Sequence, residues 1–192
     1  MRKSLLLGTI LGGLVAFIWS NISWELLHWH ESSLMAFQDE DAVGRIVQDH
    51  TAKSGLYIYP GGPVQPGLTP EQKKAAEADA GEKMKKGPMV FAAVRREGFG
   101  SFARGVVIQF LTQLAAAFLL TWLLLKTAGL NYWQRVIFLM TVGLAAGVIS
   151  ELPNWNWWGF SESYTAVAVV DNAVTWFIAG LAIAKVAPPK TT

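Results

Sequence analysis

The chain has 192 residues, 52% of them hydrophobic, a formal net charge of +2 and no cysteine. The lack of cysteine excludes a disulfide framework, a thiolate metal site and a thiol nucleophile. The apolar residues are gathered into four long runs, and the basic residues of the long loop are matched by acids. This composition predicts an integral membrane protein without a nucleic-acid partner.

The first apolar run predicts a membrane anchor. About 20 mainly apolar residues cross the hydrocarbon core of a bilayer, and residues 4–27 meet that length. The run follows Met-Arg-Lys, as in a secretory signal peptide, but bulky Phe17, Ile18 and Trp19 stand where a cleavage site needs small residues. We therefore expect residues 1–27 to form an uncleaved signal-anchor helix.

Residues 28–103 predict a small α+β cap between the first and second membrane helices. Acidic residues 39–41 precede helically spaced apolar residues that stop at Gly55, and "GLYIY" then favours a strand. Thr69 and Pro70 suit the start of a second helix, which Gly87 ends. "MVFAAV" is either a second strand or a lead-in to the next span. Large apolar residues are too few here for an independent core.

The remaining apolar runs predict three more transmembrane helices, over residues 105–125, 133–150 and 165–186, joined by a turn at 126–135 and a hairpin at 151–164. Two pairs of glycines four residues apart, Gly8 with Gly12 and Gly143 with Gly147, predict close helix contacts. The sequence does not show whether these contacts lie within one chain or between subunits.

The distribution of charge predicts the orientation. The segments at both ends of the chain and at the 126–135 turn hold six basic residues and no acid: Arg2, Lys3, Lys126, Arg135, Lys185 and Lys190. Short loops rich in lysine and arginine stay in the cytoplasm. We expect a multi-pass protein of a cell inner (plasma) membrane with both termini cytoplasmic. The predicted fold is an all-α membrane protein with four transmembrane helices, an extracytoplasmic cap over 28–103 and the last three helices within 104–192.

Tryptophans are dense at the predicted outer end of the helices. Trp155, Trp157 and Trp158 stand in the predicted hairpin, and Trp24 stands at the outer end of the first span. Indoles gather at the headgroup level of membranes, which explains most of them. Their density also suits a clamp on a lipid, a quinone, a pigment or a neighbouring subunit. Both interpretations remain open.

Polar residues within the spans form a second candidate site. Asp171 lies inside the fourth run, Glu151 at the end of the third, and Gln109 and Gln113 share one face of the second. A charge in hydrocarbon costs at least ~2.5 kcal/mol, so such residues are functional candidates. They would line a polar cavity open to the outside if they converge, or otherwise serve as hydrogen-bonding contacts between helices.

A third candidate site is a mononuclear metal centre. Glu25 and His28 are three residues apart on one helix face, and His30 follows. These three could ligate a metal, or one histidine could ligate a haem or a pigment. The alternative is a water-exposed pair of interfacial histidines. The sequence identifies no cofactor and no catalytic motif.

The expected function is that of a non-catalytic accessory or assembly subunit. Its partners would be the lipid bilayer and other membrane-protein subunits, bound through the outer face. One alternative is a cofactor- or metal-binding subunit of a membrane redox enzyme, with Glu25, His28, His30 and Asp171 as ligands or proton carriers. A small-solute transporter is a weaker alternative, because the predicted inner half of the spans has few polar residues.

Overall fold

The computed structural model describes residues 2–64 and 66–188, so Lys190 lies outside the described residues. The chain divides into two compact units, each described by itself. The helical unit comprises residues 1–35, 101–155 and 160–192, and the cap unit comprises residues 36–100 and 156–159.

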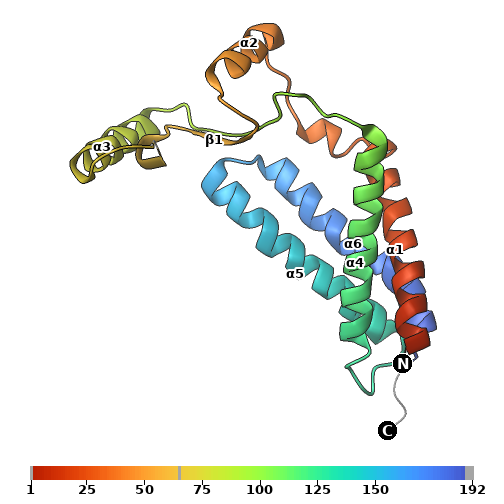
Figure 1. The fold of residues 1–192 in the computed structure, drawn as a ribbon. Helices are drawn as coiled ribbons and strands as arrows, with labels where there is room; N and C mark the ends of the chain where they lie inside the picture. Colours follow the sequence, from red (N-terminus) through yellow and green to blue (C-terminus); the bar gives the residue numbers. More distant parts are fainter. Residues whose placement is uncertain (1, 65, 189–192) are drawn as a thin grey trace. The chain divides into compact units, whose positions relative to one another are not determined.

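The helical unit is built from four long helices, α1 (Arg2–Glu25), α4 (Phe102–Leu124), α5 (Tyr132–Trp158) and α6 (Glu162–Val186). All four are long and apolar enough to cross a membrane. They overlap the four predicted runs, so the prediction of four long apolar helices is confirmed. In Figure 1, α1 and α4 lie side by side, and α5 and α6 follow each other as an antiparallel pair.

The hairpin predicted over residues 151–164 is wrong. Helix α5 continues to Trp158 with Pro153 inside it, and α6 begins at Glu162. A proline removes one backbone donor but does not by itself stop a membrane helix, because nearby polar groups can satisfy the backbone. One residue further along, the side chain of Asn154 donates to the carbonyl of Ser150 at 3.0 Å, which adds a contact across the same turn. The helix ends instead at Trp158. The next residue, Gly159, has a φ of 75°, which is the left-handed conformation common after a helix.

Close helix contacts in the helical unit depend on the predicted glycines. A Cβ added to Gly8 would lie 2.4 Å from the Thr121 side chain on α4. A Cβ added to Gly143 would lie 2.7 Å from the backbone oxygen of Asn172 and 2.5 Å from Trp176 on α6. The glycine contacts therefore form within one chain, which answers the question that the sequence left open.

The outward faces of the long helices are apolar. In the most apolar stretch of each, between 11% and 33% of the residues are buried. The fully buried side chains are few, and the largest of them include Leu139, Ile183 and Val136. A helix that exposes most of its apolar residues suits a lipid environment, where association depends on close packing rather than on a large hydrophobic core.

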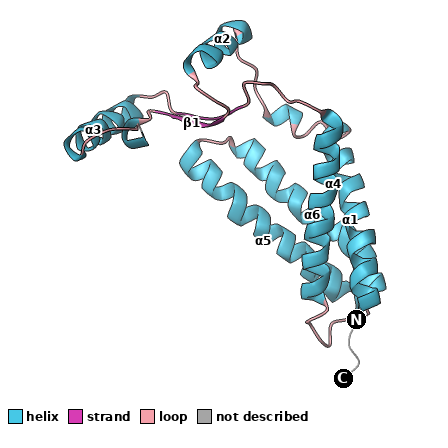
Figure 2. Ribbon diagram, in the orientation of Figure 1, coloured by secondary structure: helices cyan, strands magenta, loops and turns pink. Residues whose placement is uncertain are grey.

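The cap unit contains a two-stranded antiparallel sheet and two helices. Strands β1 (Gly55–Tyr59) and β2 (Val90–Val94) pair antiparallel, and Figure 2 shows them in magenta. The first strand was predicted, and of the two alternatives for the second segment the strand is the one observed. Helix α2 (Glu40–His50) begins at the N-cap Asp39, and α3 (Pro70–Lys86) begins with a capping box formed by Thr69 and Gln72. Two short 3-10 helices, η1 (Glu31–Ser33) in the helical unit and η2 (Gly62–Val64) in the cap unit, complete the elements.

The cap unit has little apolar interior, as predicted. Helix α2 has no buried residue, and Ala80 is the buried residue of α3. Polar contacts join the two chain segments at one end of the sheet: the hydroxyl of Ser54 accepts from the backbone of Arg96 at 2.9 Å and donates to Glu97 at 2.5 Å. This hydrogen bond from Ser54 lowers the pKa of the Glu97 carboxyl.

A methyl group at Gly143 tests the contact between α5 and α6. Gly143→Ala pushes the new Cβ against backbone as well as side chain, so we expect unfolding to become easier by about 1–3 kcal/mol. Thermal unfolding in mild detergent measures this change. Gly81→Ala is the matched control, because no atom lies within 4 Å of the added Cβ and alanine favours a helix. Equal stability of Gly143→Ala and the wild type would contradict the contact.

Candidate functional site

A buried carboxyl group is the centre of the candidate site. Asp171 lies in α6 and is 9% exposed. Its Oδ1 accepts a hydrogen bond from Nε1 of Trp19 on α1 at 2.8 Å. Its Oδ2 lies 3.3 Å from Nε2 of His30. The Asp171 cluster comprises this carboxyl and its surrounding side chains, which are Trp19, Ser23, Trp24, Trp29 and His30.

The end of α1 folds back to place His30 in the cluster. Helix α1 ends at Glu25, and His28 adopts a φ of 54°. This left-handed conformation is uncommon outside glycine, although histidine is among the residues that tolerate it. His30 then precedes η1, and the Ser33 hydroxyl donates to the His30 carbonyl at 2.6 Å. The turn brings the imidazole back over Ser23, which lies one helical turn beyond Trp19 on α1.

Two indoles and a hydroxyl enclose the imidazole of His30, which is 2% exposed. The Trp24 ring stacks on it with centroids 4.0 Å apart and planes 3° apart, and the Trp29 ring meets it edge-on at 5.7 Å. The Ser23 hydroxyl lies 3.1 Å from His30 Nε2 and accepts from Trp29 Nε1 at 2.9 Å. The cluster is therefore closed by its own contacts rather than open to solvent.

The two ring nitrogens of His30 have different surroundings. Nε2 lies within hydrogen-bonding distance of both Asp171 Oδ2 and the Ser23 hydroxyl. Nδ1 of His30 is buried, and among the described residues it has no hydrogen-bond partner. A buried polar atom without a partner is costly. The cluster thus holds one unsatisfied group on the side of the imidazole away from Asp171.

The cluster does not have the geometry of a hydrolase triad. In a Ser-His-Asp triad the serine and the aspartate contact different nitrogens of the imidazole. One nitrogen accepts the proton of the serine hydroxyl, and the N–H of the other nitrogen donates to the aspartate. Here Ser23 and Asp171 both approach Nε2. The arrangement therefore does not activate Ser23 as a nucleophile.

The structure separates the three residues of the predicted metal centre. Glu25 and His28 are exposed, whereas His30 is buried and faces Asp171. Water-exposed histidines were the other expectation, and burial corrects that expectation for His30. Across residues 2–64 and 66–188, no group of three or more histidine or carboxylate side chains is placed to hold a metal ion. Coordination by Glu25, His28 and His30 stays a prediction.

The other polar candidates do not join the Asp171 cluster. Gln109 is exposed and Gln113 is half-buried on α4. Glu151 on α5 accepts from the hydroxyl of its neighbour Ser150 at 3.0 Å. Within the described parts of the chain, no hydrogen bond connects these three side chains to Asp171. These residues lie toward the same predicted end of the spans, but no shared cavity around Asp171 is observed among the described residues.

The predicted tryptophans lie largely on the surface. Trp24, Trp155 and Trp157 are 49%, 44% and 68% exposed. Trp158 is 37% exposed, and within the cap unit its ring stacks on Phe91 with centroids 4.6 Å apart. Since residues 151–158 are helical, three of these indoles stand on a rigid element rather than on a loop.

Sequence reasoning missed the roles of Trp19 and Trp29. Trp19 appeared there as a residue too bulky for a cleavage site, yet its indole N–H is the strongest donor to Asp171 by distance. The signal was the spacing of Trp19 and Ser23, which are four apart and share one helix face. Trp29 carried no such signal, because its position depends on the turn at His28.

No protein-family model, curated protein or solved structure matches this chain. Function must therefore be inferred from the residues themselves. Two features of the described chain stand out for that purpose: the closed Asp171 cluster and the exposed indoles.

Replacing the buried carboxyl tests the cluster. Asp171→Ala removes the acceptor of Trp19 Nε1 and one of the two partners of His30 Nε2, and each lost hydrogen bond costs about 1–3 kcal/mol. We expect unfolding in detergent, followed by tryptophan fluorescence, to show a loss of about 2–5 kcal/mol. Glu25→Ala, at an exposed position, is the control and is expected to change little. A similar small effect in both variants would show that Asp171 is not a structural acceptor.

Proposed function

We propose that this chain is a non-catalytic accessory or assembly subunit of a cell inner membrane, binding a membrane partner or lipid through its outer face. The observation that carries the proposal is the exposure of Trp155 and Trp157 on the last turns of α5. Exposed tryptophans on a rigid helix lose little entropy on binding and are frequent at the energetic centres of interfaces.

The spacing of the indoles supports contact on more than one side. At about 100° per residue, Trp155 and Trp157 point to nearly opposite sides of the helix. One side can then meet lipid headgroups while the other meets a protein. The closed Asp171 cluster supports the same proposal, because its serine lacks the geometry of a nucleophile and its imidazole is shielded by indoles.

The proposed orientation has both termini in the cytoplasm and residues 28–103 outside. It is supported by the exposed cations Arg2, Lys3, Lys126 and Lys185, which stand at the ends of α1, α4 and α6. Short cationic segments resist translocation, whereas long loops cross largely regardless of charge.

One buried nitrogen of His30 favours a second candidate function, which is the binding of a cofactor or metal. Nδ1 of His30 is buried without a partner among the described residues, between two indoles. An imidazole nitrogen is a common ligand of metals and haem. On this alternative the chain is a cofactor- or metal-binding subunit of a membrane redox enzyme.

Single cysteines test the orientation, because the chain contains none of its own. We expect a membrane-impermeant maleimide to label Gly44→Cys in intact spheroplasts and to label Lys126→Cys after lysis. A Cβ added at Gly44 meets no atom within 4 Å and Lys126 is exposed, so both thiols are accessible. Labelling in the reverse order would place the cap unit in the cytoplasm.

Partner retention tests the accessory role. We expect a protein or lipid to travel with the wild type through mild-detergent purification and mass spectrometry, and Trp157→Ala to retain several-fold less of it because a large exposed indole is lost. Trp122→Ala, on α4 and 47% exposed, is the matched control. A lone wild-type chain would contradict the proposal. An absorption band or stoichiometric metal in the same preparation would favour the redox alternative.

A further inference from the structure

Two glutamines stand in the apolar stretch of α4. Gln109 is exposed and Gln113 is half-buried. At 1.5 Å per residue, Gln109 lies about 10 Å and Gln113 about 16 Å from the start of the helix, which is about 34 Å long. The hydrocarbon core of a bilayer is about 30 Å thick. Where α4 crosses a membrane, both amides therefore lie inside that core, and Gln113 lies near its middle.

Both glutamines lie on the flank of α4, beside its contact with α1. That contact includes Phe110, whose ring meets the ring of Phe17 with centroids 5.3 Å apart. At about 100° per residue, Gln109 is turned about 100° and Gln113 about 60° from Phe110, in the same direction. The two are about 40° from each other, so they form one narrow strip along the helix, the glutamine strip.

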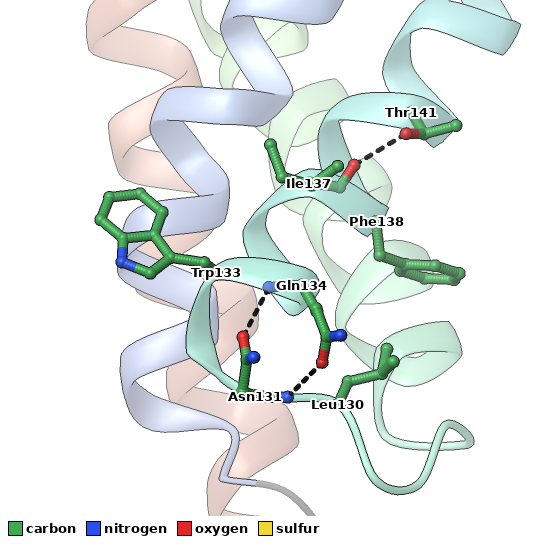
Figure 3. A pocket seen from close by; sticks show the side chains of 7 residues that line it. All are labelled: Leu130, Asn131, Trp133, Gln134, Ile137, Phe138 and Thr141. Atoms are coloured by element: carbon green, nitrogen blue, oxygen red, sulfur yellow. Dashed lines mark hydrogen bonds between the residues drawn. The ribbon is translucent and has the colours of Figure 1, made fainter.

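Polar side chains at comparable positions on α5 are satisfied by the helix itself. Figure 3 shows two of these bonds beside the open pocket on α5. The hydroxyl of Thr141 donates to the carbonyl of Ile137 at 2.9 Å. The side chain of Gln134 accepts from the backbone of Asn131 at 2.9 Å, and the side chain of Asn131 accepts from the backbone of Gln134 at 3.0 Å. These groups need no partner from another molecule.

The two glutamines of α4 are not satisfied in this way. The hydroxyl of Thr112, which stands between them, donates to the carbonyl of Ile108 at 2.9 Å. Across the described parts of the chain, neither glutamine amide takes part in a hydrogen bond. An amide in hydrocarbon has no water to replace that bond, so leaving it unpaired is costly. Membrane helices reduce this cost by pairing such side chains with another helix.

We propose that a second copy of this chain packs against α4 along the glutamine strip, with the glutamines of the two copies bonded to each other. A primary amide is both a donor and an acceptor, so identical glutamines can bond reciprocally across a two-fold axis. Two copies inserted in the same direction also place these amides at the same depth. Gly105 and Ala116 lie within about 40° of Gln109 on the same flank. Small residues there allow two helices to approach closely.

Such pairing requires α4 to cross a membrane, but it requires neither an accessory role nor a given orientation. It uses the flank of a helix within the bilayer, whereas the proposed function uses the exposed indoles at the end of α5. Pairing of two copies and retention of another partner are therefore measured separately.

Disulfide trapping in native membranes tests the pairing, because the chain has no cysteine of its own. Gln109→Cys retains Gln113, and after oxidation it is expected to give several-fold more covalent dimer than Leu111→Cys. Leu111 is the matched control, since it is 55% exposed and lies between the two glutamines in depth. It is about 160° around the helix from either of them, so its thiol reports random collisions.

Removing the remaining amide tests whether hydrogen bonds hold the pair. Gln113→Leu, added to Gln109→Cys, leaves an apolar surface of similar size and is expected to lower the yield of trapped dimer by about three- to tenfold. Thr112→Val in the same background is the control and is expected to keep the yield, because the Thr112 hydroxyl is already bonded to its own helix. Circular dichroism of the purified variants checks that both keep their helices.

Four outcomes would overturn the proposal. Equal trapping at Gln109→Cys and Leu111→Cys would show that the glutamine strip meets no second copy. An undiminished yield in the Gln113→Leu variant would show that the amides do not hold the pair. A labelled wild-type chain that stays monomeric in lipid vesicles, by single-molecule photobleaching, would leave the amides to a different protein or to lipid. Loss of the chain from carbonate-washed membranes would remove the requirement that α4 crosses a membrane.

Discussion

The buried carboxyl of Asp171 sets the strongest constraint on the helical unit, because it must be given donors wherever it lies. Trp19 supplies one at 2.8 Å and His30 stands at 3.3 Å from the other oxygen. Satisfying it therefore ties α6 to α1 and ties the chain after α1 back onto that helix. A carboxyl in an apolar bundle fixes which faces meet, whereas apolar contacts between similar helices leave that choice open.

The two ends of the helical unit treat buried charge in opposite ways. Around Asp171 the chain provides its own donors, and the Trp24 indole covers one face of the His30 imidazole by stacking at 4.0 Å. Around Arg135 the described residues form no salt bridge, and the guanidinium keeps an unpaired nitrogen. Neither arrangement is fully satisfied among the described residues, because Nδ1 of His30 and Nη2 of Arg135 are both buried without a hydrogen-bond partner.

Features set by local chemistry could be predicted from the sequence. Four apolar runs predicted four long helices, and Thr69, Pro70 and Gly87 marked the ends of α3. The continuation of α5 through residues 151–158 could not be predicted, because Pro153 is compatible with either a helix end or a continuing helix. The Asp171 cluster was half visible: the sequence selected Asp171 and His30 but not their pairing. That pairing depends on the left-handed turn at His28. It also depends on contacts over long sequence separations, of 141 positions between His30 and Asp171 and of 152 positions between Trp19 and Asp171.

Helix α6 is the element through which these constraints act together. On one side Gly143 and Gly147 of α5 let its backbone approach closely, and on the other Asp171 and Ile183 meet α1. Because few large side chains are buried, the fit depends on small residues and on one polar network, both of which tolerate little displacement. The helical unit is therefore expected to behave as a rigid support. Under the proposed function, binding of a partner would then fall to the exposed indoles at the end of α5.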